Sequence, residues 1–198
     1  MKSMYLFIDT ETTGLPLDYE APIEDTDNWP RIVQLAWQLH DNKGQLLTKR
    51  NDIILPEGFS IPRKVSEIHG ITDAMARDRG IPLIVVISLL VRILPRVQLI
   101  VGHNIFFDRS VLGAELIRTT TITDFLSKPT FCTMRSTTDL CKIPRKGYTS
   151  YKLPKLEELY YHLFGDIPPA SHDAAHDVEM CARCFFGIIE LGFKVFGE

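Results

Sequence analysis

The sequence predicts a single α/β domain, with a mixed central sheet flanked by helices in three layers. Two observations lead to this prediction. Three strand patterns occur within the first 55 residues, and helical patterns alternate with short strand patterns after them. The chain has 198 residues, which favours one domain because domains average roughly 150 residues. Its 45% hydrophobic and 24% charged residues exclude a wholly disordered or fibrous protein. We therefore expect residues 1–198 to form one domain.

Three strands are expected first. Residues 5–9 form a short apolar run with Phe and Ile, which is typical of a buried strand. Residues 31–41 alternate with period two, which predicts a strand with one drier face. Turn residues at 42–44 lead to a returning strand at 45–55, so these two strands are expected to form a hairpin.

The remaining elements are mostly helices. A short helix is expected to end near Gly70, and residues 71–73 have the pattern of a new helix start. Further helices are expected at 82–94, 107–118, 134–141, about 154–164 and from Asp177 nearly to the C-terminus, with short strands at 97–103 and 131–133.

Charge and hydropathy restrict the function without naming it. The formal net charge is −3, so a nucleic-acid role would need a local site or metal ions. The apolar run near the N-terminus, about five residues, is too short for a signal peptide. The longest apolar stretch, residues 81–94, is shorter than the ~20 residues of a membrane span and is interpreted as a buried helix. A cytoplasmic protein without a membrane anchor is therefore expected.

Four cysteines raise the question of a disulfide framework or a zinc site. Disulfides are not expected without a secretory signal. Cys181 and Cys184 form a C-x-x-C pattern, and Cys132 and Cys141 would complete four thiolates for zinc. However, Cys181 and Cys184 fall within a helical apolar pattern, and the other two lack paired ligand spacing. We therefore favour cysteines that pack in the interior.

Asp9 and Glu11 lie two residues apart at the end of the first predicted strand. Side chains alternate along a strand, so both carboxylates project from one face with Cα atoms roughly 6.6 Å apart. Like charges this close repel each other unless a cation bridges them or one keeps its proton. A solvated strand end is the alternative for this pair alone.

Two further aspartates stand at predicted helix starts. Asp108 ends the segment G-H-N-I-F-F-D after an apolar strand, and Asp177 opens the last helix. Helix capping or the helix dipole would also explain either carboxylate. His172 lies on a Gly/Pro-rich loop five positions before Asp177, and Asp173 and His176 are interpreted as neutral surface residues.

The motifs D-T-E-T-T-G, H-N-I-F-F-D and H-x-A-x-x-D occur in this order, at a strand end and two helix starts. Together they resemble the DEDDh (DnaQ-like) 3′–5′ exonuclease family, which includes the epsilon subunit of DNA polymerase III and ribonuclease T. The resemblance runs from Tyr5 to about Phe186. It implies a ribonuclease H-like fold and an enzyme that releases nucleoside 5′-monophosphates from a single-stranded 3′ end.

The resemblance also assigns roles to single positions. Asp9 matches a ligand of both of two divalent ions, Glu11 and Asp177 match ligands of the ion on the side of the nucleophile, and Asp108 matches support for the second ion; His172 matches the general base. Oxygen ligands suit Mg²⁺ or Mn²⁺, and two such ions can clamp the attacking and leaving oxygens of a phosphodiester. The positions expected to bind the terminal nucleotide are Thr12, Thr13 and Leu15 in a turn, with Leu15 as a wedge against the base, and His69, Asn104 and Phe107 as pocket wall.

Substrate, partners and two segments stay open. DNA is favoured as the single-stranded substrate, with RNA as the alternative, and a polymerase subunit or a second copy of the chain is open as protein partner. Residues 16–30, with three prolines and five carboxylates, are expected either to cover the site as a lid or to decorate an edge. Basic and aromatic residues within 142–155 are expected either to steer a single strand or to form a solvated loop.

Two other classes of function are weighed. A catalytically weak nucleic-acid-binding module would keep the fold without turnover, but all five matched active-site positions are intact. A phosphatase is suggested by the superficial likeness of F-I-D-T-E-T to a D-x-D-x-T nucleophile motif. That chemistry needs a second aspartate where Glu11 stands and gives H-N-I-F-F-D no role. We therefore expect an active exonuclease.

Overall fold

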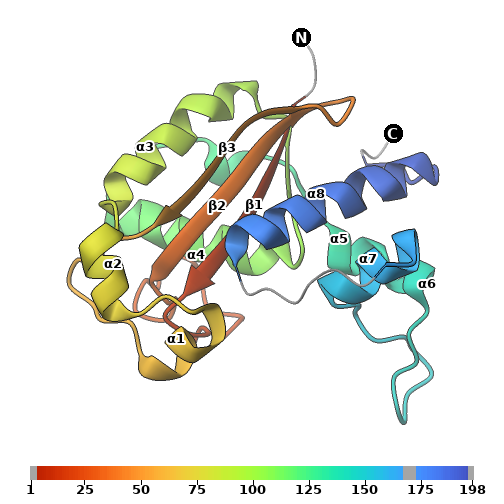
Figure 1. The fold of residues 1–198 in the computed structure, drawn as a ribbon, viewed down its shortest axis with the longest axis horizontal. Helices are drawn as coiled ribbons and strands as arrows, with labels where there is room; N and C mark the ends of the chain where they lie inside the picture. Colours follow the sequence, from red (N-terminus) through yellow and green to blue (C-terminus); the bar gives the residue numbers. More distant parts are fainter. Residues whose placement is uncertain (1–3, 167–172, 196–198) are drawn as a thin grey trace.

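Residues 4–166 and 173–195 are described by a computed structural model, and they form the predicted mixed sheet with helices on both faces (Figure 1). The strands are β1 (Met4–Thr12), β2 (Ile32–Asp41), β3 (Leu46–Ile53), β4 (Leu99–Gly102) and β5 (Thr130–Cys132). Their order is β3-β2-β1-β4-β5, where β1, β2 and β3 pair antiparallel and β4 is parallel to both of its neighbours. The predicted strands and hairpin are confirmed.

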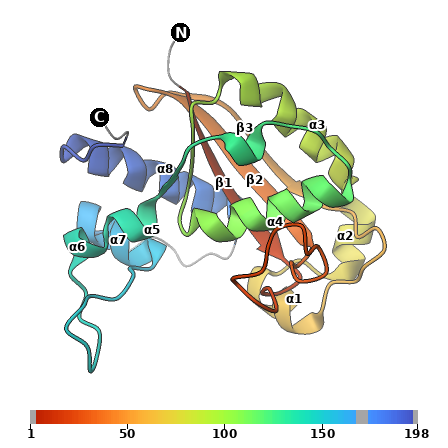
Figure 2. The same ribbon diagram turned by 180° about the vertical axis from the view of Figure 1, so that it is seen from behind.

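Helices cover the two faces of this sheet. α3 and α4 lie on one face, whereas α8 crosses the other with α7 beside it (Figures 1 and 2). The helices are α1 (Arg63–His69), α2 (Asp73–Arg79), α3 (Leu83–Ile93), α4 (Ile105–Arg118), α5 (Thr133–Ser136), α6 (Thr138–Cys141), α7 (Leu156–Phe164) and α8 (Ala174–Glu190), with 3₁₀ turns at Leu94–Arg96 and Phe125–Ser127.

Alternating side chains of β1 build a hydrophobic core on each face of the sheet. Leu6 and Ile8 belong to the core beneath α3 and α4, and Tyr5 and Phe7 belong to the core beneath α7 and α8. Phe185 of α8 contacts both of these rings edge-on, at centroid distances of 5.3 Å. The central strand is therefore buried on both sides.

The most apolar helix, α3, packs one face into the first core, whereas Ile84 and Val85 are each 46% exposed, so the interpretation as a buried helix holds for one face only. Leu83, Val86, Ile87 and Leu90 are all buried against the sheet. Within residues 4–166 and 173–195, no helix combines the length and apolar character needed to cross a membrane.

Strand β2 differs from the predicted strand with one drier face, because all ten of its residues are buried. The polar residues Gln34, Gln38 and His40 belong to this buried set. They find partners beneath α8: the Nε2 atom of His40 lies 2.9 Å from Oε1 of Gln38. The alternating side chains of β2 thus form one apolar face and one polar face, and both faces are buried.

The helix predicted at 134–141 is instead two short helices, α5 and α6, which break at Thr137. Thr137 and Thr138 each donate their hydroxyl to the carbonyl four residues earlier, at 2.7 and 3.2 Å. Such side-chain hydrogen bonds compete with the backbone ladder and bend helices.

The last helix, α8, begins at Ala174 and not at Asp177. Asp173 caps it, because its Oδ1 accepts hydrogen bonds from the backbone N–H groups of Ala175 (2.9 Å) and His176 (3.3 Å). Asp173 is therefore not the neutral surface residue that the sequence suggested, and Asp177 lies in the first turn without capping it.

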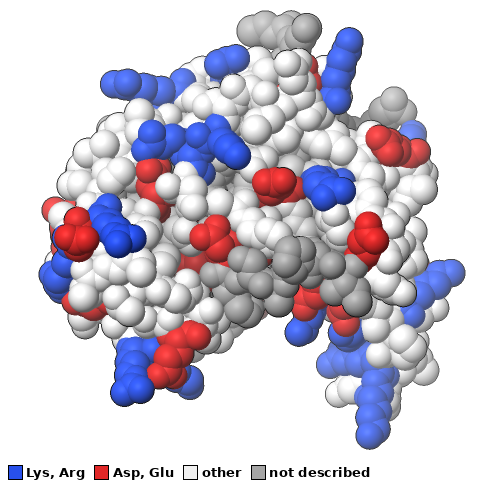
Figure 3. Space-filling view, in the orientation of Figure 1, with Lys and Arg blue, Asp and Glu red and all other residues white. Residues whose placement is uncertain are grey.

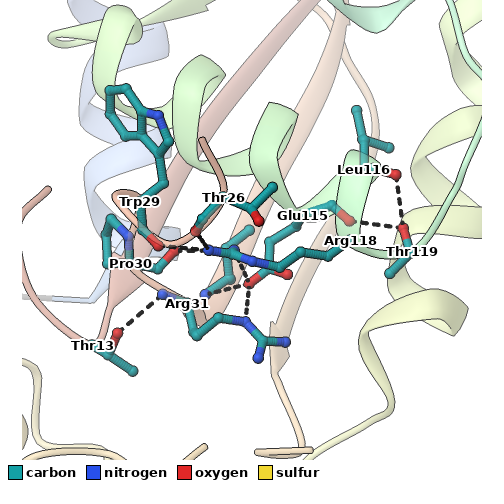
Figure 4. A network of polar contacts seen from close by, with 10 residues as sticks. Thr13, Thr26, Trp29, Pro30, Arg31, Glu115, Leu116, Arg118 and Thr119 are labelled. Atoms are coloured by element: carbon teal, nitrogen blue, oxygen red, sulfur yellow. Dashed lines mark hydrogen bonds and ion pairs between the residues drawn. The ribbon is translucent and has the colours of Figure 1, made fainter. Parts of the chain in front are cut away.

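Residues 16–30 pack against α4. Trp29 is buried in the first core, and Ile23 covers Gly113 so closely that a Cβ there would lie 2.9 Å from its methyl group. Arg118 of α4 donates hydrogen bonds to the carbonyls of Thr26 and Trp29, the latter at 2.6 Å (Figure 4). This segment therefore belongs to the layer of α3 and α4.

Candidate active site

Three carboxylates meet where β1 ends against the first turn of α8. Asp9 and Glu11 continue the side of β1 that packs on α8, and Asp177 projects from that helix. One carboxylate oxygen of each residue lies within 4.8 Å of the other two. In the described part of the chain, no other group of His, Cys, Asp and Glu side chains meets this geometric condition. Three oxygens at this separation suit a hard divalent cation.

Asp108 lies next to this group, in the first turn of α4. Its Oδ1 accepts hydrogen bonds from the backbone N–H of Thr10 (2.9 Å) and from the Thr10 hydroxyl (2.8 Å). Asp108 is only 3% exposed, and Asn104, not Asp108, is the N-cap of α4. The two bonds hold α4 against the strand that bears Asp9, and thereby place Asp108 beside the three carboxylates.

Burial and mutual repulsion favour the protonated forms of these acids. Burial raises the pKa of Glu11 to about 7, and the charges of Asp177 and Asp108 act in the same direction. Burial raises the pKa of Asp108 to about 7 as well, although the hydrogen bonds from Thr10 oppose this. The pKa of Asp9 is raised well above its usual range by burial and then by the neighbouring carboxylates. Among the described residues, the charged groups that shift the pKa values of Asp9 and Glu11 are all carboxylates, and a bound divalent cation would counter their repulsion.

Gln34 of β2 fastens the start of α8 to the sheet. It stands opposite Glu11 in the β1–β2 register. Its Nε2 donates to Oδ2 of Asp173 and its Oε1 accepts from the N–H of Ala174, both at 3.2 Å. These bonds set the position of Asp177 relative to Glu11. The motifs in the sequence do not reveal Gln34 or Asp173, and the available signal is a glutamine within a largely apolar strand.

The turn after β1 contains three of the residues expected to bind nucleotide. Thr12 is buried and donates its hydroxyl to the carbonyl of Gly14 at 2.6 Å. Thr13 donates its N–H to the carbonyl of Arg31 at 2.9 Å, and its hydroxyl accepts from the Arg31 N–H at 3.0 Å. Leu15 is 71% exposed, so it projects from a turn that internal hydrogen bonds have shaped.

A buried carboxylate connects this turn to α4. Oε1 of Glu115 lies 2.8 Å from Nε of Arg31 and 3.2 Å from Nη1 of Arg118, and it also accepts from the N–H of Ile32 (Figure 4). Because Arg31 exchanges hydrogen bonds with Thr13, the ion pair between Glu115 and Arg31 connects the turn to α4. This network was not evident in the sequence, since its members lie far apart in the chain.

The three expected wall residues lie on α1 and at the start of α4. α1 lies beside the carboxyl end of β1 in both views (Figures 1 and 2). Nδ1 of the buried His69 accepts the N–H of Ile71 at 3.1 Å, so the neutral ring has its hydrogen on Nε2, which has no partner among the described residues. Burial lowers the pKa of His69, which favours this neutral form. Asn104 has left-handed backbone angles (φ 70°, ψ 40°), and Phe107 packs partly on the first core.

The expected general base, His172, lies outside the described residues. The described chain resumes with Asp173, the cap of α8. The role of His172 therefore stays a prediction.

Two of the four cysteines pack in the interior, and among the described side chains no three of the four come together with the spacing of metal ligands. Cys181 and Cys184 are buried on α8 against the second core, and Cys132 and Cys141 are half-buried. Within the residues that the structure describes, the cluster of carboxylates is the one candidate metal group. Burial raises the pKa of Cys184 to about 12, so this thiol keeps its proton.

Comparisons with known proteins agree with this arrangement. The profile of the RNase_T family, described as exonuclease, matches residues 6–185. A search of curated proteins gave no match. Among solved structures, E. coli Exonuclease I in complex with a dT13 oligonucleotide has 19% identity and a TM-score of 0.70, over 96% of this chain and 41% of that chain.

Two further structures show the same likeness. Exonuclease I from Methylocaldum szegediense, which is moderately thermophilic, has 22% identity and a TM-score of 0.73, over 95% of this chain and 40% of that one. The zinc ion bound form of an E. coli ExoI–ssDNA complex has 19% identity and a TM-score of 0.69, over 96% and 41% of the two chains.

The chain spans about two fifths of the length of these solved structures. At such identities the likeness shows the fold, and this fold is the ribonuclease H-like one that the resemblance implied. The family match covers most of the chain and includes all three acidic motifs. This chain belongs to the RNase_T exonuclease family.

Proposed function

We propose that this protein is a metal-dependent 3′–5′ exonuclease that shortens single-stranded nucleic acid, with DNA favoured, and releases nucleoside 5′-monophosphates. The observation that supports this most strongly is the group formed by Asp9, Glu11 and Asp177, whose carboxylate oxygens lie within 4.8 Å of one another at the end of the central strand. Membership of an exonuclease family supplies the class of reaction.

The donor set fits Mg²⁺ or Mn²⁺, which prefer oxygen ligands. Asp9, Glu11 and Asp177 would hold one ion, and Asp108 would help to hold a second. Two divalent ions bound there would stabilise the negative charge on the attacking and leaving oxygens of the phosphodiester. Thr10 holds Asp108 in place by two hydrogen bonds before any ion binds.

We assign the proton transfer to His172. A neutral imidazole, whose ordinary pKa is about 6.5, accepts a proton from the attacking water as the water oxygen bonds to phosphorus. The bond from phosphorus to the 3′ oxygen of the preceding nucleotide then breaks, and this oxygen takes up a proton from solvent. The products are a nucleoside 5′-monophosphate and a strand with a new 3′-hydroxyl.

The turn of Thr12, Thr13 and Leu15 would hold the terminal nucleotide, with the exposed Leu15 side chain against its base. His69 offers a buried N–H donor at Nε2 that lacks a partner in the described part of the chain, and an acceptor atom on the nucleotide would satisfy it. DNA is favoured because similar Exonuclease I structures contain single-stranded DNA. RNA is the alternative, because discrimination depends on contacts to the 2′-hydroxyl.

The experiment is digestion of 5′-labelled DNA and RNA strands of one sequence, with Mg²⁺, Mn²⁺ or a chelator. We expect a ladder that shortens from the 3′ end, only with metal and faster for DNA. His172→Ala should slow it by about 10²-fold or more, the usual contribution of a general base. His162→Ala, at an exposed position on α7, is the matched control and should behave as wild type. Immediate release of the labelled 5′ nucleotide, or no shortening of either polymer by the folded protein, would refute the proposal.

A further inference from the structure

Residues 142–155, between α6 and α7, form a projection that we call the basic finger. Both ribbon views show it extending away from the body of the molecule, and Figure 3 shows blue side chains gathered there (Figures 1, 2 and 3). It contains five of the 22 Lys and Arg residues of the chain and none of the 25 Asp and Glu residues. These five are Lys142, Arg145, Lys146, Lys152 and Lys155.

The basic finger has a defined fold. Pro144 and Tyr151 pair in an antiparallel bridge, and the N–H of Lys152 donates to the carbonyl of Ile143 at 3.0 Å. Gly147 at the tip has a left-handed φ of 79°, which glycine adopts at little cost. The charges are therefore displayed on a short hairpin.

An arginine and an aromatic ring are paired near the tip. The guanidinium of Arg145 lies 3.9 Å from the centroid of the Tyr148 ring, while Tyr148 is 64% exposed. A guanidinium that stacks on one face of a ring remains exposed to solvent, and its N–H groups remain able to donate hydrogen bonds to a ligand.

The charges at the tip are not neutralised by carboxylates of the protein. At the base of the finger, Lys152 and Lys155 form ion pairs with glutamates of α7. Arg145 and Lys146 form no ion pair with any residue in the described ranges, and both are exposed. The tip is thus a local positive charge on a protein of net charge −3.

The base of the finger is anchored beside the carboxylates. His103 contacts the carbonyl of Pro154 through Nε2 and the hydroxyl of Thr133 through Nδ1, each at 3.0 Å. His103 directly precedes Asn104, the N-cap of α4, whose first turn bears Asp108. The finger therefore begins at the edge of the sheet where the candidate active site lies.

We propose that the basic finger binds the phosphate backbone of the substrate strand at nucleotides upstream of the reacting 3′ end. This inference rests on the proposed function. A polyanion complements the unpaired charges of Arg145 and Lys146, and the exposed ring of Tyr148 can stack on an unpaired base. The geometry favours a single strand over a duplex, because bases within a duplex do not offer their faces to a tyrosine.

The test compares two substrates that differ in length. A dinucleotide has only the bond that is cut, whereas a strand of about 20 nucleotides exceeds the 4–16 nucleotides that one single-strand-binding domain typically covers. For Arg145→Gln/Lys146→Gln, we expect a several-fold higher KM on the long strand and unaltered kinetics on the dinucleotide. The slope of log KM against log salt should fall by about 1.4, since each lost contact to a single strand removes about 0.7.

The matched control is Arg92→Gln/Arg96→Gln, which removes the same charge from exposed positions at the end of α3, near the start of β4. This variant should keep the wild-type salt slope. An unchanged slope in the finger variant, an equal change in the control variant, or an equal loss on the dinucleotide would each overturn the proposal.

Binding of a labelled single strand in chelator separates this inference from the proposed function. If the wild-type protein cuts no strand under any condition, the proposed function fails. The proposed role of the finger is still supported if the wild type binds the strand more tightly than the finger variant does. This role is refuted if the two affinities are equal.

Discussion

At the scale of single residues, the site consists of acids in an environment that disfavours their charge. Asp108 is buried and Asp9 is half-buried, and the pKa of each lies above its ordinary value, mainly because of desolvation. The same environment favours bound cations, because a divalent ion replaces the protons and removes the repulsion between carboxylates. Proton binding and metal binding are therefore expected to compete in this protein.

The stability of the metal-free protein should accordingly fall as the pH rises. In the unfolded chain Glu11 and Asp108 lose their protons near their ordinary pKa values of 4.5 and 3.8, but in the folded protein both pKa values are about 7. The folded state then binds more protons, so this stability is present below about pH 4 and is lost as the pH rises through about 7. Thermal unfolding in chelator should give a lower Tm at pH 8 than at pH 5.

Asp108→Asn is the comparison for this pH dependence, since it removes one of the acids and should flatten the slope. His103 is retained in both proteins, and burial lowers its pKa to about 4, so it acts in the opposite direction below about pH 6.5. Mg²⁺ or Mn²⁺ should raise the Tm more at pH 8 than at pH 5. The account would be contradicted if, in chelator, the Tm of the wild type rose with pH and did so as steeply as the Tm of Asp108→Asn.

Gln34 provides a test of positioning at the same scale. In Gln34→Met, the start of α8 loses its hydrogen bonds to the sheet, and Asp177 is no longer held against Glu11. We expect Mn²⁺ affinity to fall about 10-fold, as for other residues that orient metal ligands. Calorimetric titration of Mn²⁺ measures this. Gln38→Met, on the same face of β2 but further from the carboxylates, is the matched control, and equal losses in the two variants would exclude a positioning role.

At the scale of elements, the site is assembled where three elements end. β1 ends with Asp9 and Glu11, and the first turns of α4 and α8 supply Asp108 and Asp177. Each helix start is fastened by a polar contact with the sheet, through Thr10 for α4 and Gln34 for α8. The segment 16–30 and the network of Glu115 then hold the turn that follows β1 (Figure 4).

Glu115 should matter for stability because it forms ion pairs with two arginines from a fully buried position. Glu115→Gln leaves Arg31 and Arg118 without their carboxylate, and we expect the free energy of unfolding to fall by about 3 kcal/mol, which is typical of a broken buried ion pair. Urea unfolding measures this difference. Glu67→Gln is the control, since its pair with Arg63 is largely exposed and should contribute less than about 1 kcal/mol. Equal effects of the two substitutions would show that the network does not stabilise the fold.

Local patterns in the sequence predict most of these elements but not how they are joined. The apolar run of β1, the alternation of β2 and the cap at Thr72 depend on neighbours in the chain, so the sequence shows them directly. The hydrogen bonds of Gln34 to Asp173 and Ala174 span about 140 residues and leave no local pattern. The start of α8 and the buried polar face of β2 follow from those distant contacts, and both were predicted incorrectly for that reason.

At the scale of the whole molecule, charge is distributed unevenly. The acidic segment 16–30 and the basic finger lie at the edge of the molecule where β1 ends (Figures 1 and 2). A net charge of −3 gives no general attraction to a polyanion, so binding of a strand would depend on bound cations and on the finger. The resemblance in the sequence predicted the four acids of the candidate site, three of which the structure brings together with the spacing of metal ligands, whereas the shape of the finger is visible only in three dimensions.

The central claim is that the carboxylates act through divalent cations. The most direct measurement is release of nucleoside 5′-monophosphate from a dinucleotide while Mg²⁺ or Mn²⁺ is titrated into the metal-free protein. We predict no product in chelator, a rate that rises with either ion, and no product at any ion concentration for Asp9→Asn that is folded by circular dichroism. Product formation in chelator, or a wild-type rate for Asp9→Asn, would contradict the account.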